Sequence, residues 1–451
     1  MKTRRSPSQL GRGPCSRLAA GSAACLLIGL LITGCGSSGG GTPTPTPTAS
    51  PTPVPASTIT VTSAQRYQAI SGFGASSAWH ATPPSDSDAA KLFSADTGAG
   101  LSLLRIRIAP DGTTVEMPTV NKALSYGVKI WAAPWSPPAE CKSNGSTNNG
   151  GSLLPACYQT WADTLANFVQ SMASQGVNLA VLSAQNEPNW VANWETCEWT
   201  PAQLLKFIRD NLGPSLLLLH NLTTPILAPE YNDWIRLADY ADPLLDDPIA
   251  ASYLRVVAVH AYGGSPYAYA NVAAKQKQLW ETEMSVSTPG NGIASGLAVA
   301  QSVHDHLTIA NVNAWHYWWI TDSDNPTQPY ALIEGGVVTK RLWVMGNYSK
   351  FVRPGSYRIA AATASGGAAQ GVQTSAYRNE AAGTLIIVCV NASSQTVRQP
   401  FTLADLRVDA VTPWVTSDSL DLAAQTSLAG GMTFTYDLPP QSVTTLVGRT
   451  Q

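Results

Sequence analysis

Between about residues 66 and 350, short apolar runs alternate with segments of helical period. In the segment 161–172, the apolar residues recur every three to four positions and so share one helical face. The segment 201–211 follows Thr200, a candidate N-cap, and starts with a proline. The apolar runs predict eight strands, at residues 69–75, 103–108, 128–133, 179–185, 225–230, 256–260, 278–283 and 312–320.

Most of these strand candidates are continuous apolar runs, which is typical of parallel strands covered on both faces. Eight parallel strands that alternate with helices over roughly 250 residues form a TIM barrel. We therefore expect an α/β fold whose catalytic (β/α)8 barrel spans residues 67–352.

The pattern of apolar and polar residues changes after Pro354. Short β-rich runs alternate with Gly, Asn and Ser turns and show no helical period, which predicts an antiparallel β-sandwich over residues 353–451. A strand within residues 59–66 precedes the barrel, and we expect it to cross over and join that sandwich. The predicted sandwich strands lie at residues 371–378, 384–391, 409–416, 432–438 and 442–447.

The first 34 residues have the composition of a bacterial export signal. A basic start leads into an apolar stretch at 18–32, which is too short to span a membrane permanently. Leu31-Ile32-Thr33-Gly34-Cys35 resembles a lipoprotein box, in which the chain is cut before a cysteine that carries lipid. We expect a signal peptide at 1–34, lipidation at Cys35 and a Gly/Ser then Thr/Pro-rich linker at 35–58. The protein would then be exported, as a cell-envelope lipoprotein that contacts the membrane only through its anchor; an ordinary secretory signal is the alternative.

Composition narrows the class of partner. Charged residues make up 12% of the chain and the formal net charge is −2, which argues against nucleic acid. The 14 Trp and 15 Tyr residues suit a cleft that binds sugars, although ordinary packing explains most of them. No Cys/His spacing suggests a metal site, and we expect no cofactor. We expect a monomer with a polysaccharide substrate.

Four cysteines remain after the expected signal and lipidation site. Cys141 and Cys157 flank a Gly/Asn/Ser-rich loop and could form a disulfide in an oxidising compartment, with Cys197 as a competitor for either. Cys389 lies in a strand-like apolar run and is expected to be a core thiol.

Two strand candidates deliver a carboxylate at or just past their C-terminal ends. Residues 181–185 lead into Asn186-Glu187-Pro188, and residues 278–283 end in Glu283. The C-terminal ends of barrel strands meet on one face, where catalysis takes place. Two carboxylates on that face are the minimal equipment for cleaving a glycosidic bond.

Glu281 competes with Glu283 for this role. Strand alternation predicts that both side chains share one face, with Glu283 nearer the catalytic end and Glu281 one layer deeper. A buried charge is costly unless it is paired, and Arg105 or Arg107 could pair with either glutamate. Position favours Glu283.

Several segments together resemble glycoside hydrolase family 30, and the resemblance covers residues 59–448. Its motifs are SGFGA at 71–75, APWSPP at 133–138, QNEP at 185–188, HAYG at 260–263, WETE at 280–283, GNYSKFVRPG at 346–355 and SVTTL at 442–446. The resemblance implies a retaining mechanism by double displacement, with Glu187 as acid/base and Glu283 as nucleophile.

Other residues are candidates for substrate binding. Asn186 is expected to hold the sugar 2-hydroxyl, and His260 to orient the carboxylates. Tyr262 and Arg105 are expected to keep Glu283 ionised. The candidate sugar platforms are Trp79, Trp135 and Trp319.

The substrate is inferred from two loops. The segments 142–153 and 190–199 look most like the xylanase and glucuronoxylanase branches of the family. The stretch 284–293, where the glucuronate-dependent enzymes carry an arginine, has neither Arg nor Lys. We therefore expect an endo-β-1,4-xylanase without a strict need for glucuronate. The alternatives are a β-1,6-glucanase, galactanase or β-xylosidase of the same family and, from another class, a non-catalytic surface glycan-binding lipoprotein.

Overall fold

The computed structural model describes residues 52–322, 330–364 and 371–451. The expected signal peptide, Cys35 and most of the linker lie outside these ranges. Within them, no helix is long and apolar enough to cross a membrane.

The first sheet closes into a barrel, which confirms the predicted fold class. Its strands run parallel in chain order from β3 to β10, and β10 pairs with both β9 and β3. Two further strands, β11 and β12, extend the sheet beyond β10. The bounds are β3 (Gly72–Ser76), β4 (Leu103–Ile108), β5 (Lys129–Pro134), β6 (Leu182–Ser183), β7 (Ile226–Leu227), β8 (Leu254–His260), β9 (Gln278–Glu283), β10 (Ala314–Asp322), β11 (Ala331–Glu334) and β12 (Val337–Val338).

Helices cover the outside of this ring. The predicted apolar face of residues 161–172 is buried in α3, and Thr200 caps α4 through a reciprocal capping box with Gln203. After α4 the chain continues in π-helical turns at Ile208–Leu212 and Ser215–Leu219, where a longer α-helix was predicted. The helices are α1 (Asp86–Phe93), α2 (Met117–Ser125), α3 (Tyr158–Ser174), α4 (Pro201–Phe207), α5 (Leu237–Asp246), α6 (Pro248–Tyr253), α7 (Ala270–Ala274), α8 (Ile293–Thr308) and α9 (Lys340–Ser349).

The barrel has two apolar layers because its strand residues alternate between outside and inside. Outward residues pack under the helices in the large core, while Leu103, Trp131 and Trp280 belong to a smaller cluster inside the ring. The interior is therefore filled by side chains and is not a pore.

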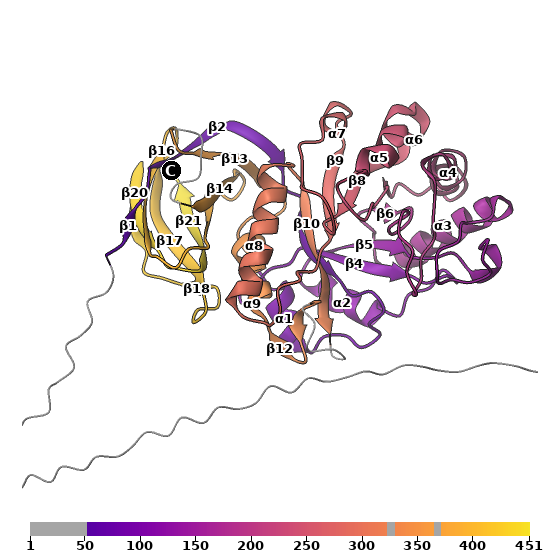
Figure 1. Cartoon of the computed structure of the whole chain (residues 1–451), viewed down its shortest axis with the longest axis horizontal. Coiled ribbons are helices and arrows are strands. Elements are labelled where there is room, and N and C mark those ends of the chain that lie inside the picture. The colour runs from indigo at the N-terminus through magenta and orange to yellow at the C-terminus, as the bar shows by residue number, and fades with distance from the viewer. Residues whose placement is uncertain (1–51, 323–329, 365–370) are drawn as a thin grey trace, which may run out of the picture. The chain divides into compact units, whose positions relative to one another are not determined.

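The second sheet is mainly antiparallel and curls around its own apolar core, which includes Val61, Ile387 and Phe401. Its strand order is β1-β16-β2-β13-β14-β15-β21-β17-β18, with β20 against β16 and β19 against β17. Strand β2 covers the segment where the sequence predicts a crossing strand, and it pairs with β13 and β16; Figure 1 shows this indigo strand beside the orange and yellow ones. The bounds are β1 (Val54–Pro55), β2 (Ile59–Ala69), β13 (Tyr357–Ala362), β14 (Val372–Asn379), β15 (Thr384–Asn391), β16 (Val397–Leu403), β17 (Val408–Thr416), β18 (Ala423–Ala424), β19 (Leu428–Gly431), β20 (Thr433–Leu438) and β21 (Ser442–Thr450).

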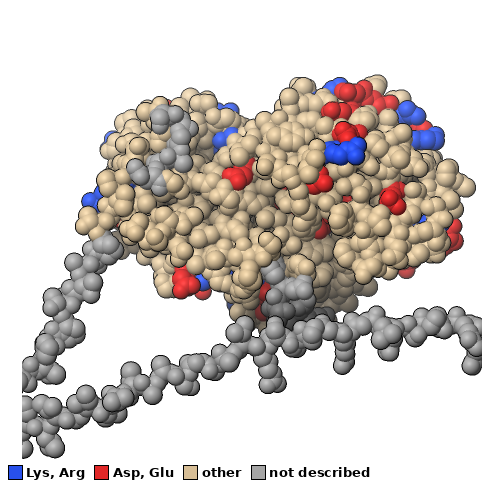
Figure 2. All heavy atoms as spheres, viewed as in Figure 1, with Lys and Arg blue, Asp and Glu red and all other residues tan. Residues whose placement is uncertain are grey.

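Helix α9 connects the two sheets. The Asn347 side chain donates hydrogen bonds to Trp414 O and Thr445 Oγ1, and Thr445 donates to Asn347 O at 2.6 Å. The face shown in Figure 2 is sparsely charged, and its charged side chains gather mainly over α5–α7. This face matches the low charged content of the chain.

Candidate active site

Glu187 lies four residues beyond the end of β6, on a backbone turn with φ of +45°. Hydrogen bonds fix the turn on both sides. Its own N–H donates to Glu230 O at 3.1 Å, the N–H of Asn186 donates to Pro134 O at 2.9 Å, and Trp190 N–H donates to Glu187 O at 3.0 Å. The carboxyl group is thus held at the C-terminal mouth of the barrel, although β6 itself is very short.

Glu283 is the last residue of β9 and is delivered by an irregularity in the strand. The pairing with β8 shifts between Val259↔Glu281 and His260↔Glu283. Trp280 lies in the interior cluster, and simple alternation would turn a residue three positions later outward. The shift brings Glu283 to the interior as well, beside His260. The register shift, and not alternation alone, therefore sets the direction of the Glu283 side chain.

The two strand-end carboxylates meet. Oxygen atoms of Glu187 and Glu283 and a ring nitrogen of His260 all lie within 4.8 Å of one another, and all three residues are buried. Retaining glycosidases hold their two carboxyl groups roughly 5–5.5 Å apart, whereas inverting enzymes leave a wider gap for a water molecule. The separation fits a reaction in which one of the two carboxylates attacks the sugar directly.

Arg105, on β4, links the groups around this pair. One of its Nη atoms contacts the Glu283 carboxylate, and the other donates to Asn186 Oδ1 and lies 2.6 Å from Glu230 Oε1. The guanidinium is fully buried and lies over the Trp135 ring. Arg107 is engaged elsewhere, in an ion pair with Glu195. Of the two arginines left open by the sequence, Arg105 is the partner of Glu283.

His260 adds a second positive charge. Burial lowers its pKa, but Glu283, Glu187 and Glu230 together raise that pKa to about 10, so the ring is an imidazolium at neutral pH. Nδ1 donates to Glu187 Oε1 at 2.9 Å, and Nε2 faces Glu230 and Glu283. A doubly protonated ring whose neighbours are already paired is poorly suited to bind a metal ion.

Two cations and three carboxyl groups form one buried cluster. Arg105 and His260 supply two positive charges against the carboxyl groups of Glu187, Glu230 and Glu283. Burial raises the pKa of Glu283, while His260 and Arg105 oppose that rise. Although burial raises the pKa of Glu230, Arg105 and His260 outweigh it, so this carboxylate stays ionised.

Glu187 and Glu283 differ in the hydrogen bonds that their carboxyl groups accept. Glu283 receives the Arg105 guanidinium and the Tyr262 hydroxyl, whose O–H donates to Oε1 at 2.9 Å. Within the described residues, the hydrogen bonds of the Glu187 carboxyl group run to Oε1, from Asn232 and His260. These bonds leave Glu187 Oε2 as the oxygen of this carboxyl group that accepts no hydrogen bond from the described residues.

Glu230 and Asn232 belong to the site but were not singled out from the sequence. Both follow β7; Glu230 has φ of +56° and accepts from the Ser183 hydroxyl. The sequence signal was Glu230 at the end of a predicted strand, the same signal that marked Glu187. This signal alone does not show that Glu230 is a counter-ion, because the sequence does not place Arg105 and His260 beside it.

Glu281 occupies a different place from Glu283. It is fully buried, and its carboxyl oxygens accept the backbone N–H groups of Glu283, at 3.1 Å, and His316, at 2.9 Å. Burial raises the pKa of Glu281 well above its ordinary value. This carboxyl group supports the backbone at the register shift and does not face the sugar gap.

Three tryptophans gather beside the carboxylates. The ring centroids of Trp79 and Trp135 are 4.8 Å apart. The Trp318 centroid lies 6.0 Å from that of Trp79 and 6.1 Å from that of Trp135. Trp79 and Trp318 are partly exposed, so they can meet a sugar. Trp319 does not belong to this cluster; its ring packs against His80 and stacks on Trp318. The sequence prediction included Trp319 and missed Trp318.

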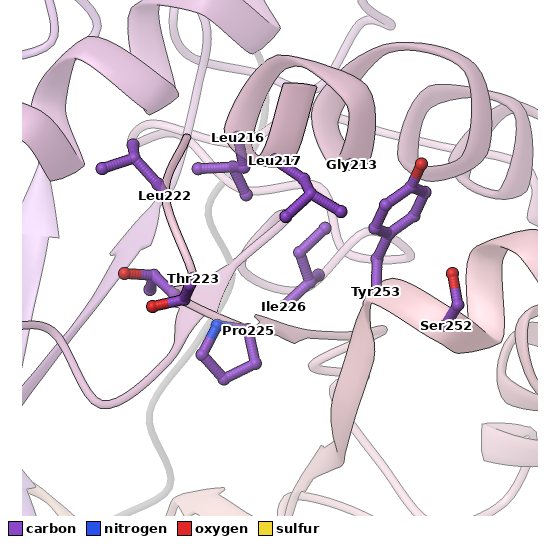
Figure 3. A pocket seen from close by; sticks show the side chains of 10 residues that line it. Gly213, Leu216, Leu217, Leu222, Thr223, Pro225, Ile226, Ser252 and Tyr253 are labelled. Atoms are coloured by element: carbon purple, nitrogen blue, oxygen red, sulfur yellow. The ribbon is translucent and has the colours of Figure 1, made fainter. Parts of the chain in front are cut away.

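Cavities at the other end of the barrel do not bear on this chemistry. The one in Figure 3 lies between the π-helical turns and the start of β7, lined by Leu216, Thr223, Pro225 and Tyr253 among others. Glu187 and Glu283 follow the C-terminal ends of β6 and β9, whereas these residues precede β7 and β8.

Comparisons with known proteins agree with the fold. The profile of the glycosyl hydrolase family 30 TIM-barrel domain matches residues 81–293. The chain is 32% identical over 362 residues to the glucuronoxylanase XynC of Bacillus subtilis, covering 77% of this chain and 81% of that protein. The crystal structure of the family 30 subfamily 8 xylanase Xyn30A from Clostridium acetobutylicum is 34% identical, with a TM-score of 0.78 over 87% of this chain and 99% of that one. A family 30 endoxylanase from Clostridium papyrosolvens is 32% identical, with a TM-score of 0.75 over 87% and 100% of the two chains.

A closed (β/α)8 barrel with two facing carboxylates at its C-terminal mouth defines a glycosidase. The fold, the match to the family profile and the extent of these similarities make the assignment more specific. The chain belongs to glycosyl hydrolase family 30.

Proposed function

We propose that this protein is a retaining endo-β-1,4-xylanase with Glu187 as acid/base and Glu283 as nucleophile. The observation that carries the proposal is the placement of the two carboxylates with oxygens within 4.8 Å. That spacing suits direct attack on the anomeric carbon and leaves no room for a water molecule between carboxylate and sugar.

In the first step, an oxygen of Glu283 forms a bond to the anomeric carbon as the glycosidic C–O bond breaks. The electron pair of that bond goes to the leaving oxygen, which takes the proton from Glu187. Arg105 and Tyr262 hold the Glu283 carboxylate ionised and oriented before attack. Asn186, fixed by Arg105, is placed to bind the 2-hydroxyl group, a contact that strengthens as positive charge develops on the sugar.

In the second step, water attacks the anomeric carbon and Glu283 leaves as a carboxylate. Glu187, now ionised, takes the proton from the water and returns to its starting form. The His260 imidazolium stabilises Glu187 while it carries the negative charge. Two inversions at one carbon retain the β configuration.

The substrate is assigned from the relatives and from one loop. The relatives described above act on xylan or glucuronoxylan by name. Residues 284–293 contain neither Arg nor Lys, so this loop offers no cation to an acidic side group. We therefore propose that the enzyme cleaves xylan without requiring glucuronate.

A panel of defined polysaccharides tests this assignment. Xylan and glucuronoxylan should both yield xylo-oligosaccharides of mixed length, with the new reducing ends formed first as the β anomer. Fragment masses and proton NMR of the early products provide the readout. Cleavage of only β-1,6-glucan or galactan, release of xylose alone, or a first product of α configuration would each contradict the proposal.

We also propose that the enzyme is exported and anchored by lipid at Cys35, with residues 35–58 as a linker. The support is the sequence Leu31–Cys35, which resembles a lipoprotein box, and the basic and apolar segments before it. Cys35→Ser should move the protein from the membrane fraction to the soluble fraction when cells are separated. The same change at Cys15, within the expected signal, is the control, and an unchanged membrane fraction for Cys35→Ser would contradict the anchor.

A further inference from the structure

Two loops at the mouth of the barrel form one unit. The loop 142–153 follows β5, and the loop 189–199 follows Glu187. Backbone bonds join them: Asn149 N–H donates to Ala192 O at 2.9 Å, Thr196 N–H to Thr147 O at 3.1 Å, and Glu198 N–H to Gly151 O at 2.9 Å. We call residues 142–153 and 189–199 the paired loops.

A buried lysine and a disulfide hold the paired loops in place. Lys142 is buried, and its ammonium donates to Ser136 Oγ, Gly150 O and Thr196 O, which satisfies all three of its donors. The Cys141–Cys157 disulfide closes the base of the first loop. Of the pairings that the sequence left open, this one forms, and Cys197 remains a buried thiol.

Two further contacts hold the second loop in place. The Arg107–Glu195 ion pair ties it to strand β4, whose Arg105 contacts Glu283. A Cβ added at Gly150 would lie 3.0 Å from a methyl group of Val191, so the two loops also pack closely. These connections define a rigid support.

This rigid support carries exposed aromatic side chains. Trp190 is 45% exposed and Trp194 is 50% exposed, whereas Leu153 and Trp199 of the paired loops are buried. Isolated exposed apolar residues are common on protein surfaces. Two indoles on a braced loop beside an active site are different, because they offer flat apolar faces on a backbone that is held in place.

The location of Trp190 indicates which part of a substrate it would meet. Its N–H donates to the carbonyl of Glu187, and the neighbouring Asn189 side chain accepts from the N–H of Asn232, whose own side chain donates to Glu187. Trp190 is thus fixed to the group that we propose protonates the leaving oxygen. Trp135 and Trp318, by contrast, lie against Arg105, and Trp79 packs against both of these rings.

We propose that Trp190 and Trp194 form a sugar-binding platform for the xylose units on the leaving-group side of the cleaved bond. This inference rests on the proposed function and adds a binding site to it. The same platform would hold an acceptor sugar in the second step. There the acceptor hydroxyl oxygen bonds to the anomeric carbon, the bond to Glu283 breaks, and the hydroxyl proton passes to Glu187.

The test compares substrates with and without sugar on that side. Trp190→Ala and Trp194→Ala should each lower kcat/KM on xylan by about tenfold, as expected for one lost aromatic contact. Their kcat/KM on an aryl β-xylobioside should stay at the wild-type value, because its leaving group is not a sugar. Xylobiose added as an acceptor should divert less of the glycosyl–enzyme to transfer products than in the wild type, and Trp190→Phe should retain most of the effect.

Leu218→Ala is the matched control, since Leu218 is 71% exposed and lies beyond α4, away from the paired loops. Unchanged xylan cleavage and acceptor transfer in both tryptophan variants would overturn the platform, as would an equal loss on the aryl xylobioside. If the wild type cleaves neither xylan nor the aryl xylobioside, the proposed function fails and the platform fails with it. A wild type active on both, with unaffected variants, refutes the platform alone.

Discussion

Glu283→Ala is expected to abolish hydrolysis, with a fall in kcat on the order of 10⁶, comparable to the loss of the nucleophile in other enzymes that form covalent intermediates. Such a loss corresponds to about 8 kcal/mol of transition-state stabilisation. The variant removes the only carboxylate that faces Glu187 across the sugar gap among the described residues, while Arg105 and His260 remain in place. Water in the vacated space cannot replace a carboxylate held at the anomeric carbon.

Azide makes this prediction specific. A small anion can enter the space left by the Glu283 side chain and attack an activated aryl β-xylobioside from the face opposite the leaving group. The product should be the α-glycosyl azide, and its configuration can be determined by NMR. Glu281→Ala is the matched control, because its carboxyl group supports the backbone of Glu283 and azide should not restore its activity. Near wild-type turnover by Glu283→Ala without azide would refute the nucleophile assignment.

The strand pattern could be predicted because barrel strands that are covered on both faces have continuous apolar sequences. Each of the eight expected runs overlaps a barrel strand, including β6 and β7, which pair over only two residues. The carboxylates could be placed at the mouth because the C-terminal ends of parallel strands share one side. The sequence thus predicts the position of Glu187 and Glu283 from topology alone.

Side-chain pairing was harder to predict, because it depends on how far along the barrel axis each residue lies. Arg105 and Arg107 share one face of β4, and only the register decides that Arg105 reaches Glu283 while Arg107 reaches Glu195. The shift between β8 and β9 changes which residues of β9 face inward, and no residue type marks it in the sequence. On β10, Ala314 is interior while Trp315 and Tyr317 are outward, so simple alternation places Trp318 rather than Trp319 among the interior tryptophans.

The cluster of charges explains why single-residue reasoning missed Glu230. Arg105 is buried completely, and a buried cation needs compensation by more than one acceptor. Glu230 supplies part of that compensation and also faces His260. The role of Glu230 is to neutralise these two cations. This role can be recognised only when the strands that carry the three residues are placed side by side.

Glu187→Gln is expected to separate substrates by their leaving groups. The amide fills the same space but cannot donate a proton to the glycosidic oxygen, so kcat/KM on xylan should fall by about 10²–10⁴. A dinitrophenyl β-xylobioside needs no protonation, and its kcat/KM should stay within about tenfold of the wild type. Measured over a series of aryl leaving groups, the logarithm of kcat/KM should depend much more steeply on leaving-group pKa in the variant.

The second step provides an independent check on the same residue. Without a base to activate water, the glycosyl–enzyme on Glu283 should accumulate, which appears as a burst of dinitrophenol and a lowered KM. Azide needs no base, so it should release the intermediate as the β-glycosyl azide. That configuration is opposite to the product of Glu283→Ala, because here Glu283 still performs the first inversion. An equal loss on good and poor leaving groups, or an α product from Glu187→Gln, would show that Glu187 does not transfer the proton.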